Sequence, residues 1–360
     1  MRYGYWLPVF GGWLRNVQDE GMEASWDYVA RLARRSEEIG YDLTLVAELL
    51  LNDIKGIGAP SLDAWSTAAA LAAVTRTLEI MVAVRPSFHA PALLAKQAAN
   101  IDNISGGRLS LNVVSAWWKD EARRYGIAFD EHDDRYARTS EWLDVVDGAW
   151  DQASLNYRGR YYTTDELVLA PKPVQRDTRR RPTIYAGGES DAAKSMIARQ
   201  CDAYVMHGDP PERIATKIAT MRELRARAGD ALGIELPPLQ FGVAAYAIVR
   251  DSDREVRAEI ARITDVSPGS PGYANYTDWI SHSQLDQQVS LTDYSVSNRG
   301  LRAELSWTPE RVAEQVEAFG EAGVDLLLLQ CSPQLEEMER FSAQVMPRVG
   351  PPERTLSTAA

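Results

Sequence analysis

Cysteine and histidine are scarce, and this limits the chemistry that the chain can support. Its 360 residues include two cysteines, Cys201 and Cys331, and four histidines. Two cysteines so far apart form neither a disulfide framework nor a metal-binding spacing. We therefore expect two buried thiols, no metal site, and a protein suited to the reducing cytoplasm.

Long apolar runs and an excess of positive charge are also missing. No window of about eighteen residues is both apolar and free of charge, which excludes a membrane-spanning helix. The amino terminus lacks the continuous apolar region of a signal peptide. The formal net charge of -12 argues against the basic face that nucleic-acid binding requires. The basic run of Arg176 and residues 179–181 is typical of a solvated loop. We expect neither a nucleic-acid nor a membrane partner.

What the chain does contain is a regular alternation of short apolar strands and helices. Strands are predicted at residues 2–8, 43–47, 78–84, 108–118, 183–186, 203–206, 241–249 and 324–330. Nearly continuous apolar strands between helices indicate parallel strands buried on both faces. Eight such units predict an α/β fold, a single TIM barrel over residues 1–348. An open doubly wound sheet is the alternative, which the absence of a G-x-G-x-x-G turn disfavours.

Two segments interrupt this alternation. Residues 155–170 show the short alternation of a small strand insertion. Residues 264–304 are rich in serine, glycine, proline, aspartate, asparagine and tyrosine. A loop of this length in a compact domain is typical of a mobile lid over an active site. Residues 349–360 are predicted to form a flexible tail.

Barrel enzymes place their active sites at the carboxyl ends of the strands. The side chains expected there are Trp6, Glu48, Arg85, Asn112, Ser115, Trp117, His207, Tyr246 and Ser332. This set contains no metal triad and no G-x-S-x-G nucleophile elbow. His207 is either a general base or a hydrogen-bonded structural histidine. Trp6, Trp117 and Trp118 either form the wall of a site for a flat ring or belong to the core.

The strongest single element is the turn Gly187-Gly188-Glu189-Ser190 before a predicted helix. Its glycines let the backbone approach a ligand, and the helix start offers free N–H groups, so the turn predicts a phosphate site. The alternative is a simple turn with Ser190 as the helix cap. Arg135 and Tyr136 open another helix, where they either clamp the same phosphate or lie on a solvated surface.

With these residues in view, the chain resembles the bacterial-luciferase-like flavin monooxygenases. Within this TIM-barrel family it is most similar to the alkanesulfonate, dimethylsulfone and pyrimidine monooxygenases that use reduced FMN. The matching motifs lie at 104–108 leading into 112–117, at 131–136, at 187–193 and at 207–211. They follow in order with matching spacing, and the similarity covers roughly residues 1–348.

The resemblance implies a cofactor, a partner and a set of binding residues. Reduced FMN would come from a separate NAD(P)H:flavin reductase, react with dioxygen to a peroxyflavin, and oxygenate an organosulfur compound, a heterocycle or an aromatic compound. The family suggests a homodimer or homotetramer. The implied FMN contacts, with the two glycines of the turn added, are Glu48, Leu49, Asn112, Glu121, Arg135, Tyr136, Gly187, Gly188 and Ser190. Asn112 would lie near the isoalloxazine edge, and Arg135, Tyr136 and Ser190 would hold the phosphate.

The chain departs from the alkanesulfonate enzymes where they bind their substrate. It has Ala244 and Tyr246 in place of an arginine and a histidine, and Ser332 in place of a tyrosine. Arg299 matches their mobile-loop arginine. The candidates for catalysis are therefore Asn112, Tyr246, His207 and Arg299, and those for the substrate pocket are Trp6, Arg85, Ser115 and Trp117. With so few cationic donors, a neutral or aromatic substrate is favoured over a sulfonate.

Three other functions are compatible with parts of the pattern. A deazaflavin-dependent dehydrogenase would use the same barrel for hydride transfer without dioxygen. A flavin-binding protein without turnover would keep the cofactor residues alone. A metal-dependent barrel hydrolase is disfavoured because the ligand residues are too few. The matches at Arg135, Tyr136 and Asn112 favour FMN over deazaflavin.

Overall fold

Eight parallel strands close into a barrel, as the sequence predicts. They are β1 (Arg2–Leu7), β2 (Leu43–Val46), β3 (Glu79–Val84), β4 (Leu109–Val113), β7 (Thr183–Ala186), β8 (Ala203–Met206), β9 (Gln240–Tyr246) and β12 (Leu326–Gln330). Each strand pairs with its neighbour in chain order, and β12 closes the barrel on β1. The computed structural model describes residues 1–115, 117–177, 181–265, 271–282 and 284–350. Residues 179 and 180 of the basic run and residues 351–360 of the expected tail lie outside these ranges.

The barrel interior is packed with apolar side chains. Its inner layer consists of Leu43, Leu45, Met81, Ala83, Tyr185, Ala203, Leu326 and Leu328. A larger core fills the space between the outer face of the strands and the helices. Because both faces of each strand are covered, the strands show the nearly continuous apolar runs seen in the sequence.

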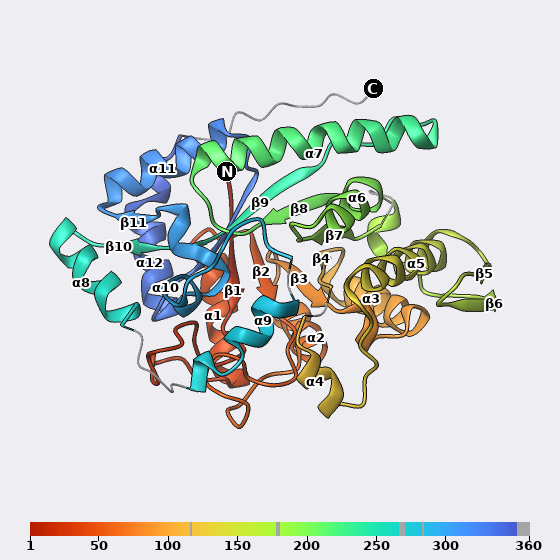
Figure 1. The fold of residues 1–360 in the computed structure, drawn as a ribbon, viewed down its shortest axis with the longest axis horizontal. Helices are drawn as coiled ribbons and strands as arrows, with labels where there is room; N and C mark the ends of the chain where they lie inside the picture. Colours follow the sequence, from red (N-terminus) through yellow and green to blue (C-terminus); the bar gives the residue numbers. More distant parts are fainter. Residues whose placement is uncertain (116, 178–180, 266–270, 283, 351–360) are drawn as a thin grey trace.

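Eight helices follow the barrel strands and cover them on the outside (Figure 1). They are α1 (Trp26–Glu38), α2 (Ala64–Val74), α3 (Pro91–Ser105), α5 (His132–Asp151), α6 (Asp191–Gln200), α7 (Pro211–Leu232), α11 (Pro309–Glu321) and α12 (Gln334–Gln344). Side chains of Ser25 and Asp63 accept backbone N–H bonds at the starts of α1 and α2. Gly106 and Gly233 end α3 and α7 in the left-handed conformation.

The structure differs from the predicted elements in several places. The strand expected over 108–118 is shorter, because β4 ends at Val113 and leaves Ser115 and Trp117 beyond the strand. The strand expected over 241–249 breaks after Tyr246, and Ile248–Val249 (β10) pairs with Ser306–Trp307 (β11) outside the barrel. Outside the segment expected as a lid, the short helices α4 (Lys119–Arg124) and α8 (Asp253–Ile263) were not predicted. Both are dominated by charged residues, and α8 buries only Val256 and Ile263. Such a narrow apolar stripe gives a weak helical signal.

Two additions project from the barrel. The antiparallel strands β5 (Leu155–Arg158) and β6 (Thr163–Leu167) form a hairpin beyond α5. A second addition, which we call the cap segment (residues 271–282 and 284–303), holds η3 (Pro271–Tyr273), α9 (Tyr276–His282), α10 (Leu291–Ser295) and η4 (Ser297–Ala303). The cap segment contributes side chains to the cavity at the carboxyl ends of the strands, so it covers the barrel mouth.

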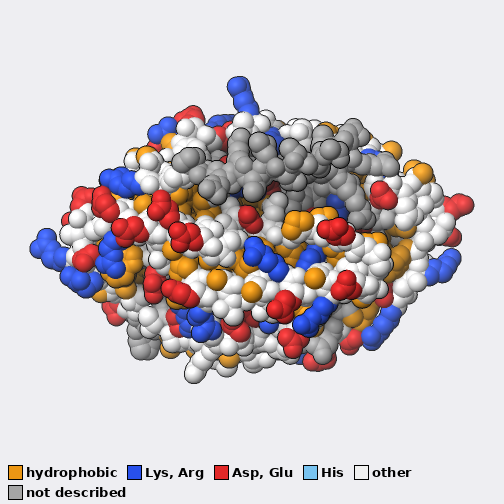
Figure 2. Space-filling view, turned by 90° about the horizontal axis from the view of Figure 1, so that it is seen from above, with side chains coloured by type: hydrophobic (Ala, Val, Ile, Leu, Met, Phe, Trp, Pro, Cys, Tyr) orange, Lys and Arg blue, Asp and Glu red, His pale blue; other side chains and the backbone are white. Residues whose placement is uncertain are grey.

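The state of the two cysteines is as predicted from the sequence, and the charged surface is mixed in sign. On the face drawn in Figure 2, acidic and basic side chains are interspersed. Cys201 and Cys331 are free and buried, and burial raises the pKa of both thiols. Among the residues described, no helix is both long and apolar enough to cross a membrane.

Candidate active site at the barrel mouth

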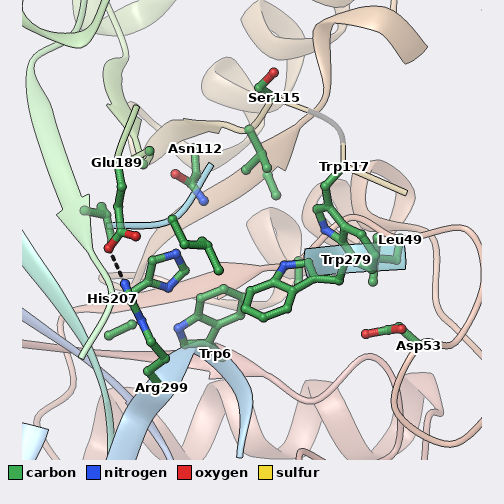
Figure 3. A pocket seen from close by; sticks show the side chains of 18 of the residues that line it. Trp6, Leu49, Asp53, Asn112, Ser115, Trp117, Glu189, His207, Trp279 and Arg299 are labelled. Carbon is green, nitrogen blue, oxygen red and sulfur yellow. Dashed lines mark hydrogen bonds and ion pairs between the residues drawn. The ribbon is translucent and has the colours of Figure 1, made fainter. Parts of the chain in front are cut away.

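A cavity of about 310 Å³ lies where the barrel strands end beneath the cap segment. Figure 3 shows side chains from the strand ends and from the cap segment around one space. The predicted site residues that line it are Trp6, Glu48, Leu49, Arg85, Asn112, Ser115, Trp117, Arg135, Tyr136, Gly187, Gly188, His207 and Arg299. The structure therefore brings together side chains that are up to about 290 positions apart in the chain, from Trp6 to Arg299.

One end of the cavity is shaped as an anion cradle. A Cβ atom added to Gly188 would lie 2.5 Å from Ala193 Cβ and 3.0 Å from the Tyr136 hydroxyl, and one added to Gly187 would lie 2.9 Å from the Val205 carbonyl oxygen. Only glycine fits this turn without displacing its neighbours. The turn leads into α6, whose first N–H groups have no partner within the helix. These features fit a phosphate group.

Side chains around this cradle add hydrogen-bonding groups. The Ser190 hydroxyl caps α6 by accepting the Ala193 N–H at 3.2 Å, and it also contacts the Tyr136 hydroxyl. Burial raises the pKa of Tyr136, and the hydroxyls of Ser190 and Ser115 and the charge of Arg135 oppose this rise. Tyr136 therefore stays a neutral donor near pH 7.

Arg135 supplies positive charge at the same end. Its guanidinium lies 4.8 Å above the Phe129 ring and donates to the Asp130 carbonyl oxygen at 3.2 Å. Burial lowers the pKa of Arg135, because desolvation disfavours its charged form. A bound phosphate would offset that penalty.

Aromatic rings form the walls of the remaining cavity. Trp6 packs edge-on against Trp13, with ring centroids 6.3 Å apart. Trp117 is stacked on Trp118 at 5.6 Å, and Trp118 is only 1% exposed. Figure 3 shows Trp6, Trp117 and Trp279 of α9 around the same space. These flat apolar surfaces suit a ring system, while Trp118 belongs to the core.

One wall carries a chain of buried charges. Glu48 Oε2 accepts the Arg85 backbone N–H at 2.9 Å and its Nε–H at 3.3 Å, and Glu48 Oε1 lies 2.6 Å from His89 Nε2. Arg85 Nη1 also pairs with Glu121. Glu121 Oε1 in turn accepts the backbone N–H groups of Leu50, at 2.6 Å, and Leu51, at 3.2 Å.

A second charged cluster joins the turn 187–190, between β7 and α6, to the cap segment. Glu189 forms an ion pair with Arg299, which also pairs with Asp286 at 3.1 Å. Lys217 lies 2.9 Å from Asp286 and 2.7 Å from Asp209. Burial and the positive charge of Arg299 lower the pKa of His207 to about 4. His207 is therefore neutral at pH 7, on the cavity wall beside this cluster.

Several polar groups on the cavity wall are buried without hydrogen-bond partners in the part of the chain that the structure describes. Among them are the Trp6 indole N–H, Arg85 Nη2, Asn112 Oδ1 and both amide atoms of Gln330. Buried polar atoms are normally paired, so this concentration points to a bound ligand. Sequence reasoning missed Gln330, although a single polar residue at the end of the apolar strand β12 marks it.

Other predicted residues lie outside the cavity lining. Glu121 pairs with Arg85 and Ser190 contacts Tyr136, and both of these partners line the cavity. Tyr246 is 1% exposed, and a Cβ atom added to Gly300 would lie 2.7 Å from Tyr246 Cβ. The expectation that Tyr246 faces a substrate is therefore not met, because the backbone of η4 packs over the end of β9. The strand ends here contribute Ala244 and Gln330 to the cavity instead of Tyr246 and Ser332.

The cap segment is attached to the barrel by residues that the sequence did not single out. Arg15 pairs with Asp53 at 2.5 Å, donates to the Gly272 carbonyl at 2.7 Å, and lies 3.9 Å above the Tyr294 ring. Asn275 Nδ2 donates to Asp53 Oδ1 at 2.7 Å. Both charged residues are nearly buried, and nothing in their local sequence marks them.

A comparison with known proteins decides the family. The profile of the luciferase-like monooxygenases matches residues 1–326. The chain belongs to this family. It is 32% identical, over 97% of its length and 95% of the relative's, to an FMNH2-dependent dimethylsulfone monooxygenase of Pseudomonas putida. A protein of the same description from Pseudomonas fluorescens (strain Pf0-1) is 31% identical over 97% of this chain and 94% of that one.

Solved structures show the same fold for this luciferase-like chain. The structure of a riboflavin lyase with modified FMN and riboflavin superposes with a TM-score of 0.79. The alignment covers 96% of this chain and 90% of that one, at 19% identity. At this identity the likeness concerns the fold alone.

Proposed function

We propose that this protein is a two-component monooxygenase that uses reduced FMN and dioxygen to oxygenate a small, neutral organosulfur compound such as a sulfone. The observation that carries the proposal is the phosphate cradle at one end of an aromatic cavity lined with unpartnered amide and indole groups. The dimethylsulfone monooxygenases that are 31–32% identical over nearly the full chain support it.

The residues present fit FMN in a defined orientation. Gly187, Gly188 and Ser190, together with Arg135 and Tyr136, would hold the phosphate. Asn112, whose buried Oδ1 has no partner among the described residues, would face the isoalloxazine edge. Reduced FMN supplies the electrons that activate dioxygen. A separate NAD(P)H:flavin reductase would provide it, in line with the FMNH2-dependent relatives.

The cavity walls would orient the substrate and keep water out. Trp6, Trp117 and the cap residue Trp279 surround the space next to Asn112. Excluding water protects a reactive oxygenating species from side reactions. The neutral His207 could accept or donate a proton at its ring nitrogen, and Arg299 would hold the cap segment in place. We also propose one barrel domain over residues 1–348 with a movable cap, assembled as a homodimer or homotetramer.

The deciding experiment follows an oxygen atom into the product. The protein is incubated with dimethyl sulfone, reduced FMN and 18O-labelled dioxygen, with a flavin reductase and NADH present. We expect one labelled oxygen atom in the organic product. A deazaflavin-dependent dehydrogenase would instead turn over without air, using a deazaflavin cofactor and no FMN. A flavin-binding protein without turnover would give no labelled product from any sulfone, sulfonate or heterocycle tested.

A further inference from the structure

The arginines that line the substrate part of the cavity are already neutralised. Arg15 is paired with Asp53, Arg299 with Glu189 and Asp286, and Arg85 with Glu48 and Glu121. All three side chains are nearly buried, with at most 6% exposed. None of these three therefore offers an uncompensated positive charge to an incoming anion in the substrate part of the cavity.

Arg85 is the most informative of these residues. Its guanidinium lies between two carboxylates whose side chains are 4% and 0% exposed. With a neutral His89, the group of Glu48, Arg85 and Glu121 carries a formal charge of -1. A protonated His89 would bring the charge to zero, so in neither state does the wall present a net positive charge.

Arg85 nevertheless keeps a hydrogen-bond donor for a ligand. Its Nη2 is buried and has no partner among the described residues, and the residue lines the cavity. The N–H groups of Trp6 and Gln330 are also buried and have no hydrogen-bond partner among the described residues. A sulfonyl or carbonyl oxygen of a neutral molecule would accept such bonds. A sulfonate would bring an uncompensated negative charge next to buried carboxylates, which is strongly unfavourable.

We infer that Glu48 and Glu121 are specificity-determining residues that make the cavity select neutral polar substrates against anionic ones of the same shape. They do so through Arg85, by cancelling its charge while leaving its N–H donor in place. The inference rests on the proposed function, because it concerns the substrate of that same site. It concerns binding, however, and so can be tested without turnover.

The test compares two probes of nearly equal size, dimethyl sulfone and methanesulfonate. Their dissociation constants are measured by calorimetry on the protein saturated with oxidised FMN, for the wild type, Glu121→Gln and Glu48→Gln. The matched control is Asp120→Asn, which removes one carboxylate from the adjacent position of α4, where Asp120 pairs with the exposed Arg123 and Arg124. Melting temperatures report whether each variant is folded.

We expect the wild type to bind the sulfone more tightly than the sulfonate. Removing either carboxylate should improve methanesulfonate binding relative to dimethyl sulfone by on the order of tenfold, the scale of one charge acting at short range in a partly buried site. Asp120→Asn should leave the ratio unchanged. A purely structural role would weaken both probes together and leave their ratio constant.

The outcomes separate this inference from the proposed function. If the sulfone binds but neither folded variant shifts the ratio, or the shift favours the sulfone, the inference is overturned and the proposed function stands. If only one of the two variants folds, the ratio of dissociation constants in that variant decides whether the inference holds. If neither probe binds the wild type, the neutral-sulfone substrate class falls, and the inference falls with it.

Discussion

At the scale of single residues, His207 has the clearest link to pH. Its folded-state pKa is about 4, below the value of about 6.5 in an unfolded chain. The unfolded state therefore binds a proton first as the pH falls, and stability present above pH 6.5 is lost down to pH 4. His207→Gln should reduce the loss of unfolding free energy between pH 7 and 4.5 by up to about 3 kcal/mol. Urea unfolding at both pH values checks this, and parallel pH profiles for the two proteins would contradict it.

At Gln330, one substitution should make the protein more stable and weaken its binding of substrate. Both of its amide atoms are buried without partners in the described structure. Replacing it with the similarly long and apolar methionine removes an unsatisfied amide, and should raise the free energy of unfolding by about 1 kcal/mol. The same change should weaken dimethyl sulfone binding. Denaturant unfolding and calorimetry measure the two effects, and a variant that loses stability would show that the amide is satisfied within the protein.

At the scale of elements, the turn between β7 and α6 should recognise a phosphate group and little else of the flavin. The double variant Ser190→Ala with Arg135→Ala removes a hydroxyl and a cation from the cradle. Charge-assisted hydrogen bonds contribute about 1.5–3 kcal/mol each, so FMN affinity should fall at least roughly tenfold. Riboflavin, which lacks the phosphate, is the matched control ligand. Fluorescence titration should show its affinity nearly unchanged, and an equal loss for both flavins would refute the assignment.

The attachment of the cap segment depends on a buried ion pair. Arg15→Met would leave Asp53 buried at 4% exposure without its cation, which typically costs about 3–5 kcal/mol. Because Arg15 also contacts Gly272 and Tyr294, the loss should release the cap segment. Limited proteolysis should then cut within residues 271–303 earlier than in the wild type. Arg227→Met, which breaks the exposed pair with Glu223, should leave the cleavage rate as it was.

A comparison of the predicted with the observed elements shows which features of the fold and the site can be predicted from the sequence. Strand and helix positions followed from apolar periodicity, and the strand ends placed Trp6, Asn112 and His207 on one cavity. The break of β9 after Tyr246 could not be foreseen, because the run 241–249 stays apolar across it and the pairing of β10 with β11 is made by residues about 60 positions away. Arg15 and Asp53 gain their role from tertiary contacts alone. Gln330 was visible in the sequence as a polar strand end.

At the scale of the whole molecule, the cavity and the cap segment must be considered together. The cavity of about 310 Å³ is at the lower end of ligand pockets, which span about 300–1,000 Å³. We therefore expect a flavin nucleotide and a substrate to share it only when the cap segment moves outward. The Glu189–Arg299 pair links the phosphate turn to the cap, and a phosphate beside Glu189 adds negative charge that competes for Arg299. Binding of FMN should therefore loosen the cap.

Hydrogen exchange detected by mass spectrometry can follow both ends of this link. FMN should slow amide exchange in residues 187–193, where we propose that its phosphate binds, and speed exchange in α9 and η4. Inorganic phosphate is the control, because it can occupy the cradle while the rest of the cavity keeps its size. It should slow exchange in residues 187–193 and speed exchange in the cap segment less than FMN does, because only the charge of the phosphate acts there. If FMN slows exchange in the turn and the cap alike, the cavity accommodates the flavin with the cap in its present position, and the proposed outward movement is wrong.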